Sequence, residues 1–514
     1  MIESIEAALF PIVCKINEYL SNYILVFLLL GIGFWYSIKT RFVQIRCFKE
    51  GWNSVFGNLS LRGKKHDSGM SSFQALATAI AAQVGTGNIV GASGAILTGG
   101  PGAIFWMWLI AFFGMATIYA EATLAQETRI VEKDGNVKGG PVYYITTAFK
   151  GGFGKFLAGF FAIAITLALG FFGCMVQSNS IGSTMQTAFG VPSWIVGLVL
   201  VAICGFIFIG GIRRIASFAE KMVPIMALIY VIGSLTIIFT NLEGVMHALE
   251  IIFVGAFDPM AATGGVIGAG IKEAIRYGVA RGLFSNEAGM GSTPHAHAVA
   301  RVKHPAEQGL AAIIGLFIHT FIVVNMNAFV ILCTGALDGT TTGIALTQKA
   351  FTLGLGTIGN GFVAGCLLFF AFTTIVGWYF FAEQNVKYLV GVRYVSIYRV
   401  LVLAFIMAGS FLHVTLVWEL ADLFNGLMAI PNIIALIGLS KVVGRALEDY
   451  EKKFLAGETP EFGELAPVPA DIPRYNGVPA QDPALEPKPQ HHRRLGGLRN
   501  RFRRRPHNAQ ENDA

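Results

Sequence analysis

The sequence predicts an all-α polytopic membrane protein in which about eleven helices cross the bilayer. Of its 514 residues, 54% are hydrophobic and 13% are charged, whereas a soluble domain carries about 25% charged residues. The apolar residues form separate runs, and a run of roughly 18 residues can already span the hydrocarbon core as a helix. Two of these runs are interrupted at mid-length by glycine and polar residues, which predicts two broken helices.

Eleven runs qualify as membrane-spanning helices by length and hydropathy. They cover residues 18–39, 71–99, 101–127, 157–185, 191–211, 222–240, 264–297, 306–335, 357–386, 397–416 and 419–440. The first run is expected to form a peripheral transmembrane helix after a short extracytoplasmic segment, residues 1–17. Residues 447–514 are charged, rich in proline and basic at their end, so we expect a disordered cytoplasmic tail that cannot bury a core.

The distribution of lysine and arginine indicates which side of the membrane each connection faces. With the N-terminus outside, twenty basic residues fall in the connections 39–70, 128–156, 210–221, 298–305 and 387–399. The opposite side carries only Lys15 and Lys349. Because cytoplasmic loops are enriched in Lys and Arg, these connections and the C-terminal tail are placed in the cytoplasm. The expected location is the cell (inner) membrane.

The order of the interrupted runs predicts two related halves. Once the N-terminal helix is set aside, ten spans remain, five in residues 71–240 and five in residues 264–440. The interrupted spans are the first and the sixth of these ten, and they run in opposite directions. Two five-helix halves of opposite orientation, each opening with a broken helix, are typical of inverted-repeat transporters. The halves share no letter-by-letter repeat, so the prediction depends on hydropathy and on the position of the breaks.

The first interrupted run, residues 71–99, has no charged residue but carries Gly85-Thr86-Gly87-Asn88 at its middle. Glycine is a poor helix former, so this segment predicts a local unwinding of the helix. Unwound backbone is stable in a membrane only where protein buries it or where it lines a polar cavity. The N–H groups of Thr86, Gly87 and Asn88 then suit a carboxylate, and the neighbouring carbonyls suit a small cation. A glycine-rich packing notch is the alternative interpretation.

The second interrupted run, residues 264–297, carries charges that a lipid-facing helix would not tolerate. We therefore expect it to lie inside the bundle and to be broken within residues 282–292, which repeat the glycine, serine and asparagine chemistry of the first break. Ser285, Asn286 and Gly289, together with freed carbonyls around them, are candidates for binding the substrate and its ammonium group.

Glu287 lies in the same break, and the sequence leaves three roles open for it. It is a direct counter-ion for an ammonium group, a proton site, or an ion-pair partner of Arg281 or Arg276. Each of these roles supplies the partner that a carboxylate inside a membrane requires.

Two further spans carry polar residues deep in the membrane. Thr373 and Thr374 offer adjacent hydroxyls that can complete an oxygen cage with the carbonyls of the first break, unless each bonds the carbonyl one turn before it. Trp378, one turn further along, either walls the pocket and limits the substrate to small molecules, or belongs to the core. Gln177, in the fourth span, either joins helices or contacts the substrate.

The residues of both breaks resemble the signature of a known family. Three segments look like motifs of the alanine or glycine:cation symporters: residues 84–91 (VGTGNIVG), 99–108 (GGPGAIFWMW) and 281–292 (RGLFSNEAGMGS). The resemblance extends over roughly residues 20–445. It implies a fold similar to the leucine-transporter superfamily, with sodium- or proton-coupled uptake of alanine, glycine and related small amino acids. It also implies a sodium site between the first break and the threonine pair, with Ala81 and Val84 offering carbonyls.

These observations predict a secondary active symporter, not an enzyme, that couples sodium or proton influx to uptake of alanine and glycine by alternating access. The sequence has no P-loop motif, so ATP is not expected to drive transport. Its six cysteines form no CxxC pair, and no cofactor is expected besides the co-transported Na⁺. Membrane lipid is an expected partner and nucleic acid is not. A passive channel for small polar solutes is the alternative, although channels typically repeat one polar motif by symmetry.

Overall fold

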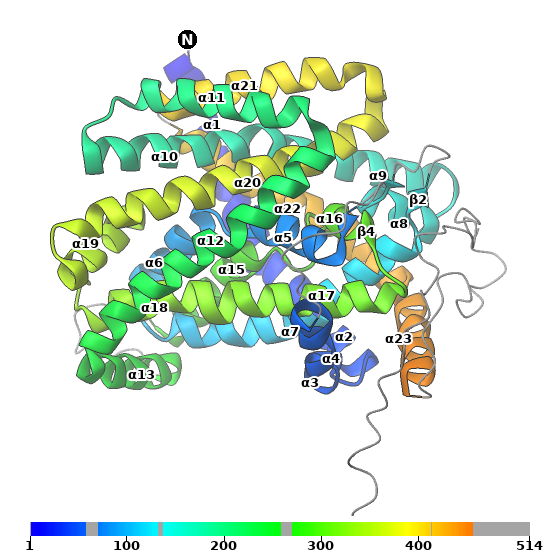
Figure 1. Cartoon of the computed structure of the whole chain (residues 1–514), viewed down its shortest axis with the longest axis horizontal. Coiled ribbons are helices and arrows are strands. Elements are labelled where there is room, and N and C mark those ends of the chain that lie inside the picture. The colour runs from blue at the N-terminus through cyan, green and yellow to red at the C-terminus, as the bar shows by residue number, and fades with distance from the viewer. Residues whose placement is uncertain (1, 58–69, 132–136, 259–269, 413, 456–514) are drawn as a thin grey trace, which may run out of the picture. The chain divides into compact units, whose positions relative to one another are not determined.

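The structure is a computed structural model, which describes residues 2–57, 70–131, 137–258, 270–412 and 414–455. The described residues form many helices and two small two-stranded sheets (Figure 1). The predicted class, an all-α polytopic membrane protein, is confirmed. The predicted tail beyond residue 455 and the start of the expected 264–297 span lie outside the described residues.

The elements up to residue 257 include two π-helical segments, η1 and η2. In chain order they are α1 (Ile2–Tyr19), η1 (Leu20–Leu25), α2 (Val26–Lys39), α3 (Val43–Arg46), α4 (Phe48–Phe56), β1 (Met70–Ser71), α5 (Ser72–Gln83), α6 (Thr86–Gly99), α7 (Ala103–Glu127), β2 (Ile130–Val131), β3 (Val137–Lys138), α8 (Pro141–Ala148), α9 (Gly151–Ile165), η2 (Thr166–Gly173), α10 (Cys174–Phe189), α11 (Ser193–Ile209), α12 (Gly211–Thr240) and α13 (Leu242–Phe257).

The elements after residue 270 include a third π-helical segment, η3, and one 3-10 turn, η4. In chain order they are α15 (Ile271–Asn286), α16 (Pro294–Ala298), β4 (Ala300–Arg301), α17 (Pro305–Phe317), η3 (Ile318–Val324), α18 (Asn325–Cys333), α19 (Gly343–Leu355), α20 (Ile358–Val390), η4 (Val392–Tyr394), α21 (Val395–Phe411), α22 (Thr415–Gly438) and α23 (Ser440–Leu455).

The strands are short and join distant parts of the chain. β1 pairs in parallel with β4, so the start of the first broken helix lies beside the segment that follows the second. β2 and β3 form an antiparallel pair after α7.

Within the described residues, eight helices are long and apolar enough to cross a membrane, judged by length and composition. The pair α5 and α6 adds a ninth if it counts as one span. Two of the eleven expected spans are shorter than expected in the described residues. The helix within 191–211 is α11, and the described part of 264–297 contains α15 and the short α16.

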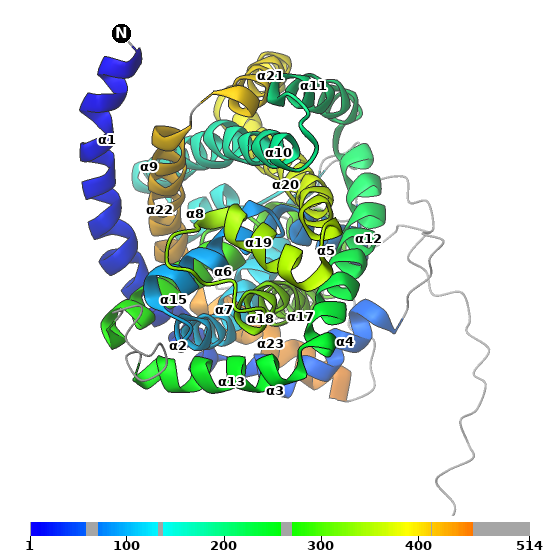
Figure 2. The same ribbon diagram turned by 90° about the vertical axis from the view of Figure 1, so that its left-hand side faces the viewer.

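The N-terminal helix is longer than the sequence analysis predicts. α1, η1 and α2 follow one another without a gap from Ile2 to Lys39, so the helix does not end at the expected boundary between residues 17 and 18. A helix continues there because η1 accommodates an extra residue within a turn without ending the helix. Where the chain enters the membrane stays a prediction. α1 stands at the edge of the bundle in Figure 2 and exposes apolar side chains such as Leu9 and Ile12.

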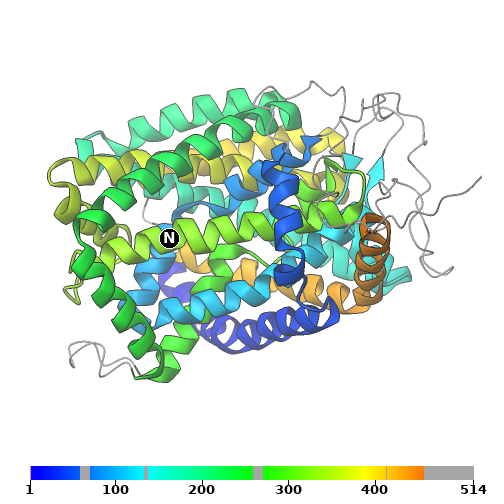
Figure 3. The ribbon, with the colours of Figure 1, turned by 60° about the horizontal axis from the view of Figure 1, so that its bottom comes forward.

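The C-terminal helix α23 corrects the predicted start of the tail. Residues 447–455 were expected to be disordered, but they form its last turns, and Leu447 and Tyr450 are buried. α23 runs crosswise to the long helices (Figure 3). Its Glu451 pairs with Arg46 over 2.6 Å and with Arg41 over 3.3 Å. The buried apolar side chains and the ion pairs together stabilise this segment as a helix, although its charged composition resembles that of the tail.

Small residues allow the second broken helix, α15, to approach α7 closely. A Cβ atom placed on Gly278 would lie 2.4 Å from the carbonyl oxygen of Ala103. One placed on Gly282 would lie 2.6 Å from the side chain of Ile110. Helices in membranes pack through such small residues because lipid supplies no hydrophobic force between them. The charged run is therefore packed against the bundle, as its composition predicts.

Candidate functional site

The first break separates α5 from α6, whose axes differ by 47°. Val84 and Gly85 lie between them, and Gly85 has an extended backbone with φ −122° and ψ −154°. The N-terminal end of α6 therefore begins at Thr86, inside the protein. The Thr86 N–H donates to Gln177 Oε1 of α10 over 3.1 Å. The break thus presents a helix N-terminus to a side-chain oxygen, as an anion-binding end would.

The second break follows α15, which ends at Asn286. Glu287, Gly289 and Gly291 all have positive φ angles, of 56°, 85° and 84°. For glycine this left-handed conformation is easily adopted, whereas for a glutamate it is uncommon. The turn ends at Pro294, which begins α16 and needs no N–H partner there.

The side chain of a buried glutamate stabilises the turn of the second break by accepting hydrogen bonds from its backbone. Glu121 of α7 accepts the N–H groups of Gly289 and Gly291, each over 3.0 Å, and the amide of Asn432 over 2.7 Å. Asn432 also donates to the Gly289 carbonyl over 2.8 Å. The predicted role of Gly289 in substrate binding therefore lacks support in the geometry, because both its N–H and its C=O are engaged outside the cavity.

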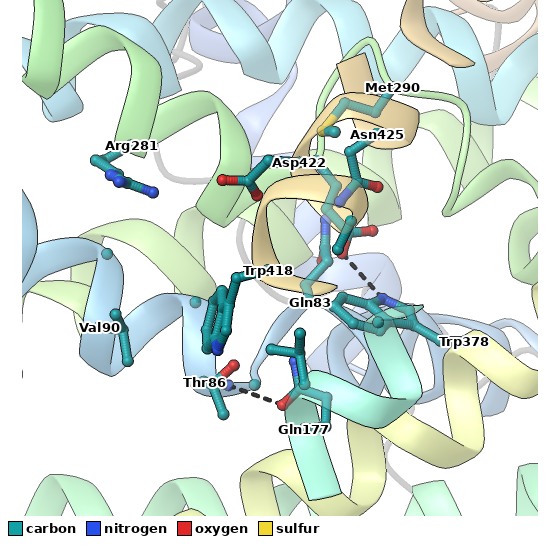
Figure 4. Close-up of a pocket in the computed structure, with 17 residues that line it drawn as sticks. Gln83, Thr86, Val90, Gln177, Arg281, Met290, Trp378, Trp418, Asp422 and Asn425 are labelled. Atoms are coloured by element: carbon teal, nitrogen blue, oxygen red, sulfur yellow. Dashed lines mark hydrogen bonds between the residues drawn. The ribbon is translucent and has the colours of Figure 1, made fainter. Parts of the chain in front are cut away.

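The two breaks enclose a cavity together with η2, α10, α20 and α22 (Figure 4). It contains about 730 Å³ of space not filled by atoms, part of which is open to solvent. Six of the ten residues predicted to bind substrate line this cavity: Gly85, Thr86, Gly87, Gln177, Glu287 and Trp378.

Glu287 and Trp378 are joined across the cavity wall. The indole Nε1–H of Trp378 donates to Glu287 Oε1 over 3.1 Å (Figure 4), and the Ser292 hydroxyl donates to Oε2. Glu287 thus has neutral hydrogen-bond partners and forms no ion pair with Arg276 or Arg281 within the described residues. Of the three roles left open by the sequence, the ion pair lacks support.

Three predicted residues face away from the cavity. Asn88 and Ser285 lie against each other behind it, with a hydrogen bond of 3.1 Å from the Ser285 hydroxyl to Asn88 Oδ1. The carbonyl of Asn286 accepts the side-chain amide of Gln83 over 2.8 Å, which ties the two breaks together. Successive helical residues point about 100° apart, so Asn88 cannot share the direction of Gly87.

One wall of the cavity consists of residues that were not predicted from the sequence. α22 contributes Trp418, Ala421, Asp422 and Asn425, and Arg281 of α15 points toward Asp422 from the other side (Figure 4). The spacing of these α22 residues, i, i+3, i+4 and i+7, marks one helical face and was the available signal.

Of the four residues predicted to bind sodium, three lie together and Thr373 lies apart from them. Thr374 Oγ1 donates to the Ala81 carbonyl over 3.0 Å, so α20 touches the end of α5. Thr373 Oγ1 instead donates to the carbonyl of Phe370 in its own helix over 3.0 Å and lies 3.5 Å from a sulfur atom of α12. Val84 lies in the break itself. Three of the four predicted positions thus gather where the first break meets α20, and Thr373 is turned toward its own helix.

Two interrupted membrane helices that border one cavity are typical of transporters. The sequence matches the model of the sodium:alanine symporter family over residues 6–464, and the chain belongs to this family.

Curated relatives agree with this assignment. The chain is similar to the sodium/alanine symporter AgcS of Methanococcus maripaludis, with 39% identity over 437 residues, or 84% of this chain and 95% of the relative. It is 40% identical to the probable sodium/glutamine symporter GlnT of Bacillus subtilis over 448 residues, which cover 87% and 91% of the two chains. The amino-acid carrier protein AlsT of the same organism is 38% identical over 450 residues, with coverage of 87% and 93%.

Proposed function

We propose that this protein couples sodium influx to the uptake of small neutral amino acids such as alanine and glycine, by alternating access. The observation that carries the proposal is that both helix breaks border one cavity, with the Thr374–Ala81 contact directly behind the first break. Sodium is also the ion in the name of the family and in the name of AgcS. Proton coupling is the alternative that the same carboxylate-lined cavity would allow.

The amino-acid carboxylate would bind at the start of α6. The Thr86 N–H already donates to a side-chain oxygen of Gln177, and a substrate carboxylate oxygen can take the same place. Gly87 lets the ligand approach the backbone, because no atom lies within 4 Å of the position of a Cβ there. The ammonium group would then face Glu287, and Trp378 would limit the room for a side chain.

The sodium ion would bind between α5 and α20. The carbonyls of Ala81 and Val84 and the hydroxyl of Thr374 would supply three hard oxygens there. Thr373 would supply a fourth if its hydroxyl left the Phe370 carbonyl and turned toward them. Binding would draw the first break against α20 and complete the neighbouring amino-acid site. One positive charge that moves inward releases about 2.3 kcal/mol per 100 mV, which is enough to concentrate a substrate about 50-fold.

The proposed architecture for this cycle is an N-terminal helix followed by a five-plus-five inverted repeat of the leucine-transporter type, about eleven spans in all. The N-terminus would lie outside and the C-terminus in the cytoplasm, as the basic residues of the connections indicate. The two broken helices would rock against the remaining helices and open the cavity to each side in turn.

The test is uptake of labelled alanine into proteoliposomes, with and without an inward sodium gradient. Sodium-dependent, saturable accumulation is expected, and Thr374→Val should abolish the sodium dependence by removing one ligand. The matched control is Thr166→Val, which removes a buried hydroxyl that bonds only its own helix, at the Ala162 carbonyl. Non-saturable flux without accumulation would indicate a channel, and sodium dependence that survives Thr374→Val would refute the cation site.

A further inference from the structure

Three buried side chains connect the two breaks behind the cavity. Asn88 of α6, Ser285 of α15 and His319 of η3 are 1%, 3% and 0% exposed. His319 Nε2 lies 2.7 Å from Asn88 Oδ1 and 3.5 Å from the Ser285 hydroxyl. None of the three is among the described residues that line the cavity. They form a separate cluster, and η3 is a third element that touches both breaks.

The orientation of the Asn88 amide sets the arrangement of protons in this cluster. With Oδ1 toward His319, as the structure has it, the amide oxygen accepts and His319 Nε2 donates to it. His319 Nδ1 is then free to accept from the Thr320 hydroxyl, 3.2 Å away. Asn88 Oδ1 receives two hydrogen bonds, from His319 and from Ser285, which use both of its lone pairs.

The nitrogen of the Asn88 side-chain amide is in an unfavourable environment. This Nδ2 group is buried and has no hydrogen-bond partner among the described residues. A buried donor without a partner is unfavourable, so an unrestrained amide would rotate or shift until its nitrogen found one. The two donors on Oδ1 oppose this movement. His319 is therefore needed to keep Asn88 in the orientation that the structure shows.

The position of the cluster links it to the cavity. Asn88 follows Gly87 directly, and Ser285 precedes Glu287 by two residues, and both of these neighbours line the cavity. The contact between Asn88 and Ser285, together with the bond from Gln83 to the Asn286 carbonyl, consequently holds the two walls at their distance. His319 lies in a π-helical segment, a form that is often found at functional sites because it displaces one turn of a helix.

We propose that His319 is a positioning residue for transport, which holds the Asn88 amide against Ser285 so that the two breaks keep the spacing required by the amino acid. The inference rests on the proposed function, because it takes the cavity as the substrate site. His319 itself does not touch the substrate. Its loss therefore affects the affinity for the amino acid through the geometry of the walls.

The test compares three substitutions in the sodium-driven alanine uptake assay. His319→Gln places an amide nitrogen near the position of Nε2 and can still donate to Asn88, so its KM for alanine should stay within about threefold of wild type. His319→Asn is too short to reach, and His319→Ala has no donor. Both should raise the KM about tenfold or more, because a buried acceptor loses its donor.

A control and a double variant separate positioning from general damage. Asn325→Ala removes a partly buried interhelical bond, which Trp108 Nε1–H donates to Asn325 Oδ1 over 2.5 Å, from the next segment of the same helix without touching either break. Its KM should equal that of wild type. If His319 acts through Asn88, adding His319→Ala to Asn88→Ala should raise the KM no further, because the two effects are not independent.

Three results would overturn the inference: an unchanged KM in His319→Ala, equal KM values in His319→Gln and His319→Asn, or additive effects in the double variant. Should His319→Ala fail to fold, as judged by size-exclusion chromatography, the pair His319→Gln and His319→Asn still decides the question. Wild-type protein that accumulates no alanine would refute the proposed function and this inference together. Normal wild-type uptake with an unaffected His319→Ala would refute this inference alone.

Discussion

Gly85→Ala tests the close approach on which the proposed cation site depends. A Cβ at this position would lie 2.5 Å from Thr374 Oγ1 and 3.1 Å from both Thr374 Cβ and Gln177 Oε1. Ordinary contacts begin at 3.4 Å, so the hydroxyl would have to move by about 0.9 Å. The same hydroxyl bonds the Ala81 carbonyl over 3.0 Å, and a movement of this size would disturb that bond.

The expected loss follows from the cost of overpacking. Extra methyl groups in a well-packed interior cost about 1–3 kcal/mol. If this cost falls on the arrangement that binds sodium, the sodium affinity drops about 5- to 150-fold, since 1.4 kcal/mol corresponds to a factor of ten. Gln177 is displaced at the same time, so the KM for alanine should rise as well, by a smaller factor.

The assay is alanine uptake at a series of external sodium concentrations, which gives the half-saturating sodium concentration for each variant. Gly94→Ala is the matched control, because it adds the same methyl group to α6 where no atom lies within 4 Å. A Gly85→Ala variant with the sodium dependence of Gly94→Ala would show that Thr374 does not share a site with the first break.

Three further predictions concern the walls of the cavity and the connections around it. Trp378→Ala should let larger neutral amino acids such as leucine compete with alanine, which an uptake competition assay would detect. If the wild-type protein already prefers aromatic amino acids as substrates, the indole does not limit the size of the substrate. Glu121→Gln should lower the melting temperature in detergent, because an amide has one acceptor oxygen where the carboxyl group has one for each of the Gly289 and Gly291 N–H groups, and a buried N–H that loses its partner costs about 1–3 kcal/mol. An unchanged melting curve would argue against this clamp. Burial lowers the pKa of His304 below its usual 6.5, so the unfolded chain takes up the proton first and stability should fall as the pH drops through about 6.5. His304→Gln should weaken that dependence, and an identical pH profile in both proteins would count against it.

Much of the site followed from residue chemistry alone. Gly85 and Gly87 place a break at mid-membrane because glycine weakens a helix wherever it stands. Gln177 and Trp378 were candidates because a polar or amphipathic side chain deep in a membrane span needs a partner. These inferences needed no knowledge of which helices are neighbours.

Other parts of the site depended on how helices are rotated about their axes. Asn88 and Ser285 were expected to meet the substrate, but each faces the other behind the cavity. Asp422 and Asn425 of α22 line the cavity, although neither was among the predicted site residues. Residues one position apart point about 100° away from each other. The sequence can therefore locate a break in a helix without showing which of its side chains face the cavity.

The ends of helices also depend on contacts that the sequence does not reveal. The sequence predicts that residues 447–455 are disordered, because their composition cannot support a core. In the structure these residues belong to α23, whose Leu447 and Tyr450 are buried. Arg41 and Arg46, which precede Glu451 by 410 and 405 residues, pair with it. Such distant partners are invisible to any local pattern.

The sequence by itself determined that this chain is a membrane transporter, and it located the two interruptions, because hydropathy and glycine content act on each segment separately. Only the tertiary structure decided which side chains enter the cavity, which carboxylate holds the second turn and which histidine connects the breaks. Those choices depend on the packing of helices against one another, and packing is set by contacts between residues that the chain brings together from far apart.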